Sequence, residues 1–306
     1  MNTKQSFDIS IRNKFLQGEE CLPGIKSSCT SEFGRSINGK MRETYFSDDF
    51  GEMILSSLSK DIVDAYKKGK GNEIDNGKFF SVASSSRFAV ASFTENRKKQ
   101  LHYIQMFEGE PIQEIQFEYP LRINGIVGTP PQMDVYIKTS VETFVEVKCH
   151  EIFDESSHSV IKLSSQYLNN SLFKDILEHY KINIANRVCE LDNEGNCTKL
   201  LLCRNHFNII SKTSRFDLKQ FLCHLMGIVS KTSRCGNQQF IYLFYKNTDI
   251  EFCPIYEDLE VEIELIKKSF KWLFDKYNIT FRIALKIQLF AMQTILLYLK
   301  LDLCYN

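Results

Sequence analysis

The sequence predicts an α/β protein in which a mixed central β-sheet is flanked by α-helices. Apolar and polar residues alternate in three successive segments, 113–122, 132–138 and 142–150, as in half-buried strands. A fourth segment, 239–245, is almost continuously apolar, which is typical of a strand buried on both faces. Helical patterns precede and follow these segments, and that order favours the α/β class.

Apolar residues at helical spacing predict the helices. The expected helices cover residues 48–68, 84–101, 159–180, 214–229 and 258–277. Residues 1–48 are polar and weakly patterned, so we expect a loosely structured arm or a peripheral cover. The apolar stretch from Ile283 to Leu303 contains Lys286, Gln288 and Gln293, which favours a buried C-terminal helix over a membrane span.

Composition leaves several function classes open. The 306 residues include 38 basic and 38 acidic ones, so the net charge neither indicates nor excludes nucleic acid. The charged start is unlike a secretion signal, so we expect a cytoplasmic protein whose ten cysteines are reduced. A zinc site at Cys189, Cys197, Cys203 and His206 is the alternative to free thiols, but the spacing is unusual for zinc.

The chemistry is predicted to lie on a β-hairpin. In an extended strand, Glu146 and Lys148 share one face, while Val145 and Val147 share the other. A hairpin that pairs 132–138 with 142–150 brings Asp134 close to both polar residues. Two carboxylates at this spacing favour a divalent cation between them, and Mg²⁺ prefers oxygen ligands. The alternative is an ordinary surface pair on an edge strand.

Asp134 followed by Glu146-Val147-Lys148 resembles the D…(D/E)xK signature of the PD-(D/E)xK, or restriction-endonuclease-like, nuclease superfamily. Residues of about 80–245 also resemble a branch of bacterial putative restriction endonucleases, through the serine-rich start at 84–86, QFEYP with Glu118, EVKCHE, and a helix with Gln220. The proline that often precedes the aspartate is displaced to positions 130 and 131.

The resemblance implies a restriction-endonuclease-like core and Mg²⁺-dependent DNA cleavage, of the restriction type and in bacterial defence. Mn²⁺ is the expected substitute for Mg²⁺. Asp134, Glu146 and Glu118 would hold the metal, Lys148 would assist the attacking water, and Gln220 would line the site. Glu118 is alternatively a salt-bridge partner, and Gln220 a helix-surface amide. Glu52 and Glu151 are further candidates, with Glu52 alternatively a plain surface residue.

We expect three segments: an N-terminal arm and helix at 1–80, a nuclease core at 81–250 and a C-terminal helical segment at 251–306. DNA is the expected partner, because basic residues surround Gln220, and a homodimer would suit double-strand cutting. The basic residues around Gln220 are Lys212, Arg215, Lys219, Lys231 and Arg234. Two other hypotheses are a non-catalytic module for DNA binding or assembly, and a structural protein with a chance motif.

Overall fold

A five-stranded mixed sheet forms the centre of the computed structural model, which describes residues 2–20, 29–69, 71–153, 160–184, 188–231 and 237–286. In sheet order, its strands are β14 (Ile279–Lys286), β13 (Gln238–Tyr245), β9 (Glu142–Lys148), β8 (Gln132–Lys138) and β7 (Glu114–Pro120). β7, β8 and β9 pair antiparallel, whereas β9, β13 and β14 pair in parallel. The predicted α/β class and mixed sheet are confirmed.

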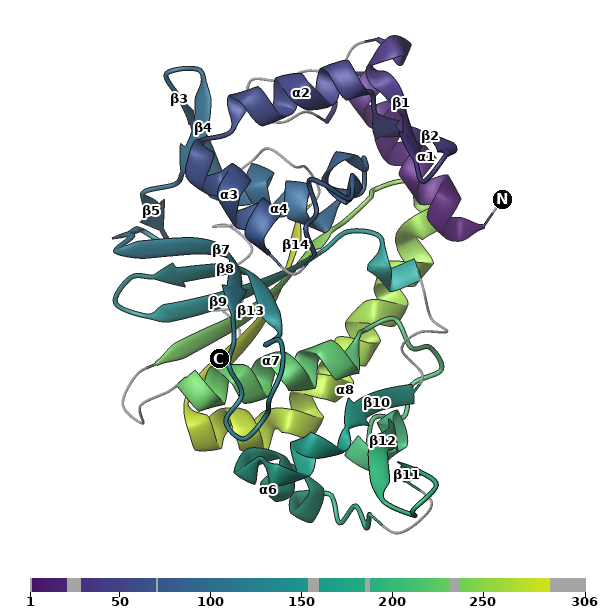
Figure 1. The fold of residues 1–306 in the computed structure, drawn as a ribbon, viewed down its shortest axis with the longest axis vertical. Helices are drawn as coiled ribbons and strands as arrows, with labels where there is room; N and C mark the ends of the chain where they lie inside the picture. The colour runs from purple at the N-terminus through teal and green to yellow at the C-terminus, as the bar shows by residue number, and fades with distance from the viewer. Residues whose placement is uncertain are drawn as a thin grey trace.

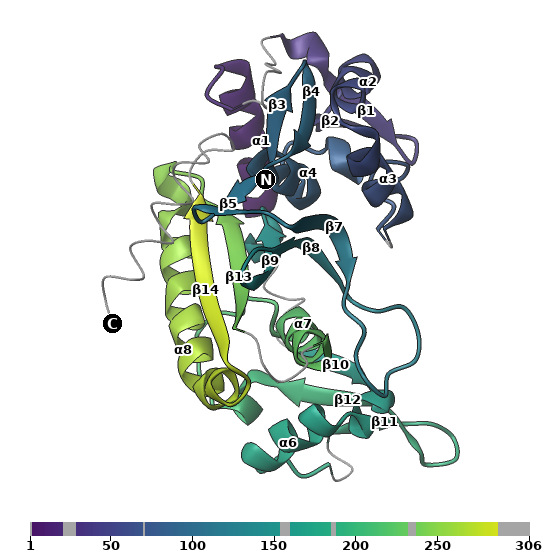
Figure 2. The ribbon, with the colours of Figure 1, turned by 90° about the vertical axis from the view of Figure 1, so that its left-hand side faces the viewer.

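Helices cover both faces of this sheet (Figure 1). α4 (Ser85–Phe93) packs on β8 and β9 from one side. On the other side lie α7 (Leu218–Lys231) and α8 (Cys253–Tyr277), whose aromatic side chains meet those of β13 and β14. Figure 2 shows α8 running beside β14, with α7 nearer to β9. Because the sheet is covered twice, all eight residues of β13 are buried, as the sequence predicts.

Of the two expectations for the N-terminal region, the loose arm is wrong, because its first helix packs against the core. α1 (Thr3–Leu16) starts with a capping box between Asn2 and Gln5, and it buries Phe7, Ile11 and Phe15 at four-residue spacing. The hairpin of β1 (Phe33–Ile37) and β2 (Lys40–Phe46) follows it. The apolar stripe of α1 therefore joins this region to the protein core.

Two predicted helices are shorter than expected. The helix at 48–68 divides into α2 (Asp48–Ser57) and α3 (Lys60–Lys68), because Leu58 is extended and bridges to Leu101. The helix that begins near Ser84 ends at Phe93, where β-branched Thr94 opens the hairpin of β3 (Thr94–Arg97) and β4 (Gln100–Tyr103). A small pair, β5 (Met106–Phe107) and β6 (Glu110–Pro111), follows.

The segment 159–180 is only partly helical. It contains β10 (Val160–Ser164) and α6 (Ser171–His179). β10 joins a second sheet with β12 (Cys197–Cys203) and β11 (Cys189–Leu191). The alternating burial of β10, with Ile161 and Leu163 inward, has the period of a strand, and the prediction missed it.

The predicted C-terminal helix is wrong at its start. Residues 279–286 form β14, which pairs in parallel with β13 along its whole length, so this segment contributes a strand to the central sheet. Residues 287–303 of that prediction lie outside the described residues. Among the described residues, no helix is long and apolar enough to cross a membrane.

Replacing Phe7 with alanine tests whether α1 belongs to the core. The Phe7 ring is fully buried and lies 4.6 Å from the ring of Phe153 and 5.3 Å from that of Phe252. We expect Phe7→Ala to lower the free energy of unfolding by about 3–5 kcal/mol in urea denaturation. Val261→Ala, on the exposed side of α8, is the control and should change it by less than about 0.5 kcal/mol. Equal effects would contradict the packing of α1.

Candidate functional site

The predicted hairpin is present and has the predicted pairing. Val135 of β8 lies opposite Val145 of β9 at the end of the paired segment, and the Asp134 side chain just beyond it accepts a hydrogen bond from the N–H of Val147 on β9. On the other edge of β9, Tyr242 and Phe244 of β13 pair with Glu146 and Lys148. The site therefore lies in the middle of the sheet, on its central strand.

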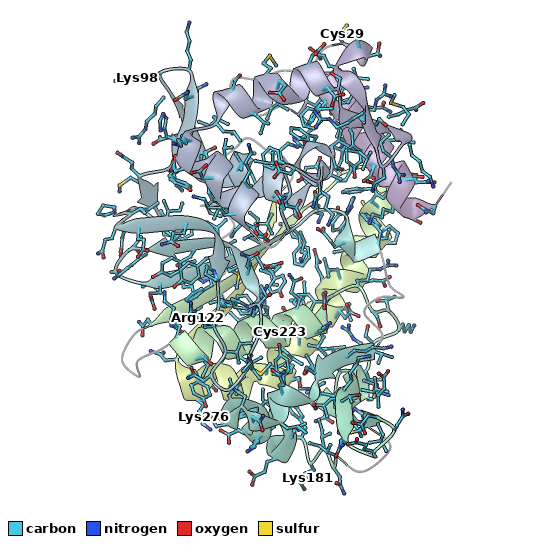
Figure 3. The ribbon with its side chains drawn as sticks, viewed as in Figure 1. Cys29, Lys98, Arg122, Lys181, Cys223 and Lys276 are labelled. Atoms are coloured by element: carbon cyan, nitrogen blue, oxygen red, sulfur yellow. The ribbon has the colours of Figure 1, made fainter. Side chains whose placement is uncertain are left out.

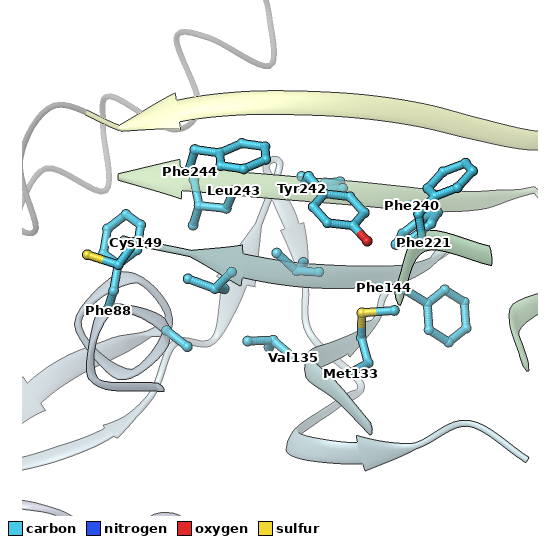
Figure 4. Close-up of a cluster of buried hydrophobic side chains, with 14 of the residues drawn as sticks. Phe88, Met133, Val135, Phe144, Cys149, Phe221, Phe240, Tyr242, Leu243 and Phe244 are labelled. Carbon is cyan, nitrogen blue, oxygen red and sulfur yellow. The ribbon is translucent and has the colours of Figure 1, made fainter. Parts of the chain in front are cut away.

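The polar face of this hairpin is covered, so the alternative of an ordinary surface pair on an edge strand is wrong. Glu146 is 1% exposed, and the Lys148 side chain is 12% exposed. β9 lies between β8 and β13, and α7 closes over the face that carries Glu146. Figure 4 shows the aromatic side chains of β13 and α7 around this strand. The carboxylate is thus removed from bulk water. In this less polar environment, charge–charge interactions are stronger than in water.

Two polar side chains hold one oxygen of Glu146. Lys148 Nζ lies 2.6 Å from Glu146 Oε1, and Gln220 Nε2 donates a hydrogen bond of 2.7 Å to the same oxygen. Gln220 lies in the first turn of α7. Asp217 caps this turn by accepting a hydrogen bond from the Gln220 backbone N–H. Gln220 is therefore part of the cluster, as the resemblance implies.

Asp134 is anchored by the backbone of the neighbouring strand. The N–H of Val147 donates a hydrogen bond of 2.6 Å to Asp134 Oδ2. Burial raises the pKa of Asp134 well above its usual range, and the nearby charge of Glu146 raises it further. The hairpin thus fixes two carboxylates that interact unfavourably when both are ionised.

Glu118 lies in the same cluster by virtue of an unusual backbone. Its φ is +52°, a left-handed value inside β7, and its carboxylate lies against Gly69 at the end of α3. A Cβ on residue 69 would come within 2.7 Å of that carboxylate, so a larger residue there would displace the Glu118 side chain. Burial and the charge of Asp134 raise the pKa of Glu118 to about 8.

Glu151 and Glu73 extend the cluster on the far side of Lys148. Glu151 follows β9 and accepts a hydrogen bond of 2.7 Å from the Cys149 N–H. Burial alone would raise the pKa of Glu151, but Lys148 and His150 outweigh this and lower it. Burial raises the pKa of Glu73, which also senses Glu151 and Lys148. Glu52 is exposed on α2 and does not join the cluster.

The cluster contains more carboxyl groups than ammonium groups. Burial raises the pKa of Glu146 to about 7, even though Lys148 opposes the shift. Burial alone would lower the pKa of Lys148, but the charges of Glu146 and Glu151 prevail and raise it, so Lys148 stays an ammonium. One lysine therefore faces several buried carboxyl groups, an arrangement that a further cation would stabilise.

Two cavities border the cluster. One of about 170 Å³ is lined by Lys148, Glu151 and Gln220, together with Asp217 at the start of α7. A larger one of about 790 Å³ reaches Glu151 from the side of α1 and β2. Its wall also carries Glu73 and the basic residues Lys4, Arg42, Lys78 and His150. Glu151 thus lies at the boundary of both cavities.

His224 and Glu73 were not predicted. His224 lies four residues after Gln220 on α7, hence on the same helix face, and its Nδ1 is 3.4 Å from Glu146 Oε2. Burial and the charge of Lys148 lower the pKa of His224 to about 3, so the ring is neutral at pH 7. The i, i+4 spacing was the available signal for His224. For Glu73 the loop sequence offers none.

No complete metal-binding group of three His, Cys, Asp or Glu side chains is formed within the described part of the chain. At the alternative zinc site, the Cys203 N–H donates to His206 Nδ1 at 3.0 Å, and Cys189, Cys197 and Cys203 are free thiols. The feature at the hairpin is therefore a pair of ligand atoms, Glu146 Oε2 and His224 Nδ1, inside an acidic environment.

Two of the basic residues expected to contact DNA are paired with acidic side chains. Arg215 lies 3.6 Å from Asp258, and Lys231 lies 2.7 Å from Glu142. Figure 3 places another basic residue, Lys98 at the tip of the β3–β4 hairpin, far from Cys223 on α7. Arg234 lies outside the described residues.

Comparisons with known proteins do not identify the chain: no family model, no curated protein and no solved structure matches it. Its function must therefore be argued from the site.

The raised pKa of Glu118 predicts how stability depends on pH. The ordinary pKa of a glutamate is 4.5, and that of Glu118 in the folded chain is about 8. Between these two pH values the folded chain holds a proton that the unfolded chain has released, so the free energy of unfolding falls as pH rises. In chelator, the free energy of unfolding should fall from pH 5 to pH 8, and Glu118→Gln should gain about 1 kcal/mol or more at pH 8. No gain at pH 8 would contradict the burial of this charge.

Proposed function

We propose that this chain is a Mg²⁺-dependent endodeoxyribonuclease of the PD-(D/E)xK type, acting at the Asp134–Glu146–Lys148 hairpin. The observation that carries the proposal is a cluster of buried carboxyl groups whose pKa values are raised, with one ammonium group among them. Such perturbed groups beside a cavity are typical of catalytic sites. The resemblance of the motif to this superfamily supplies the reaction class.

The donor atoms suit a hard divalent cation. Asp134, Glu146 and Glu118 would supply carboxylate oxygens, and Glu146 Oε2 is buried with no hydrogen-bond partner within the described segments. A bound Mg²⁺ would lower the pKa values of these carboxyl groups and polarise a phosphoryl oxygen.

The protein's own residues would prepare the phosphate and the ligands. Lys148, as an ammonium, can donate hydrogen bonds to a phosphoryl oxygen on which charge develops. Gln220 holds Glu146 through Oε1, and this leaves Oε2 facing His224 of α7. The Val147 N–H likewise holds Asp134. These contacts hold the reacting groups before the substrate arrives.

The larger cavity is the proposed approach for the DNA backbone. It reaches Glu151, next to Lys148, and its wall carries Lys4, Arg42 and Lys78. Basic side chains of this kind hold phosphates without regard to sequence.

A non-catalytic DNA-binding module is the second candidate. The observation in its favour is the 2.6 Å ion pair between Lys148 and Glu146, which partly neutralises the carboxylate without a metal. The two candidates differ in metal affinity, since a module that has lost catalysis needs no cation in the hairpin.

Cleavage of plasmid DNA tests the proposal. We expect Lys148→Ala and Asp134→Ala each to reduce the Mg²⁺-dependent rate by about 100-fold or more, because each removes a group that acts at the phosphate or its metal. Glu142→Gln is the matched control: it lies on β9 as well, but contacts Tyr136 and Lys231. Its rate should match that of the unmodified chain. A reaction in chelator gives the rate without Mg²⁺, which is subtracted as background. Full Mg²⁺-dependent activity of either alanine variant would refute the assignment.

A further inference from the structure

Two buried acceptor atoms face each other between β9 and α7. Glu146 Oε2 and His224 Nδ1 lie 3.4 Å apart, both residues are 1% exposed, and neither atom has a hydrogen-bond partner among the described residues. The hydroxyl of Tyr242, which pairs with Glu146 across the sheet, is also buried without one. Buried polar atoms are normally paired, so this group of three requires an explanation.

The other polar atoms of the two side chains are already engaged. Lys148 and Gln220 occupy Glu146 Oε1, and the imidazole of His224 hydrogen-bonds to the backbone of Gln132. A metal-ligating histidine almost always uses its second nitrogen in this way, because a backbone carbonyl fixes the ring and its tautomer. The contact with Gln132 thus leaves Nδ1 as the atom directed at Glu146.

The separation of 3.4 Å suits a shared ion. Two neighbouring ligands at about 2.1 Å from one ion lie about 3.0 Å apart in octahedral geometry and about 3.4 Å apart in tetrahedral geometry. The distance between Glu146 Oε2 and His224 Nδ1 is therefore that expected for two neighbouring ligand atoms of one metal ion.

We propose that His224 Nδ1 and Glu146 Oε2 together bind a divalent transition-metal ion, so that the site takes Mn²⁺ in preference to Mg²⁺. The inference rests on the metal site of the proposed function and adds a nitrogen ligand to it. Mg²⁺ favours oxygen ligands only, whereas ions of the transition series accept imidazole. Asp134, on the neighbouring strand β8, would supply a further oxygen ligand to such an ion.

Electron paramagnetic resonance of added Mn²⁺ tests the proposal on the full chain. The signal of free Mn²⁺ gives the dissociation constant, competition with Mg²⁺ gives the selectivity, and pulsed spectra of bound Mn²⁺ show whether a nitrogen is coupled to it. We expect a nitrogen coupling in the unmodified chain. It should change to the ¹⁵N pattern when only the histidines are labelled with ¹⁵N.

His224→Leu, which keeps a side chain of similar bulk, should remove the nitrogen coupling and weaken Mn²⁺ binding at least tenfold. Loss of even an outer partner of a ligand costs about 10- to 100-fold. Binding of Mg²⁺ should weaken less, so the preference for Mn²⁺ should fall. His206→Ala is the control for loss of a histidine outside the site, and it should change neither quantity. If His224→Leu does not fold, the ¹⁵N experiment on the unmodified chain decides.

The outcomes separate the two proposals. Bound Mn²⁺ without nitrogen coupling would overturn the role of His224 and leave the oxygen site intact. Coupling without any DNA cleavage in Mn²⁺ would support the nitrogen ligand and overturn the nuclease function. Absence of Mn²⁺ binding at millimolar concentration would overturn both.

Discussion

The burial of Glu146 on the central strand is the constraint on which the site depends. A carboxylate that is 1% exposed is stable in its charged form only with compensating partners, and the fold supplies Lys148 from the same strand and Gln220 from α7. α7 must therefore pack over β9 for the site to exist. Its aromatic contacts, such as Phe221 with Phe240 at 5.7 Å, hold it there.

The N-terminal elements complete the site as well as the core. α3 ends at Gly69, which permits the close approach of Glu118, and the loop after it brings Glu73 beside Glu151. α1 and β2 form part of the wall of the larger cavity. The segments before and after the predicted core therefore contribute to one structure, with β14 as the edge strand of its sheet.

Periodicity predicted the strands because the sheet separates apolar from polar residues along most of their length. β8 matches its prediction, and β13 and α8 are close to theirs. It did not predict the cover over Glu146, because the packing of α7 depends on residues far away in sequence. The positive φ of Glu118 has no sequence signal, since glutamate rarely adopts it. His224 was visible beside Gln220 at i, i+4, but only the structure places its ring against Glu146.

If the buried, partly protonated carboxyl groups form a binding site for a divalent cation, calorimetry will detect the binding. Mg²⁺ titrated into the chain at pH 7, in buffers of different ionisation enthalpy, reports both binding and the number of protons released. The pKa of Glu146 is about 7 and that of Glu118 is about 8, so both carboxyl groups hold protons at pH 7 in the metal-free chain. We therefore expect Mg²⁺ to bind and these protons to be released. Absence of binding at millimolar Mg²⁺, or binding without proton release, would contradict it.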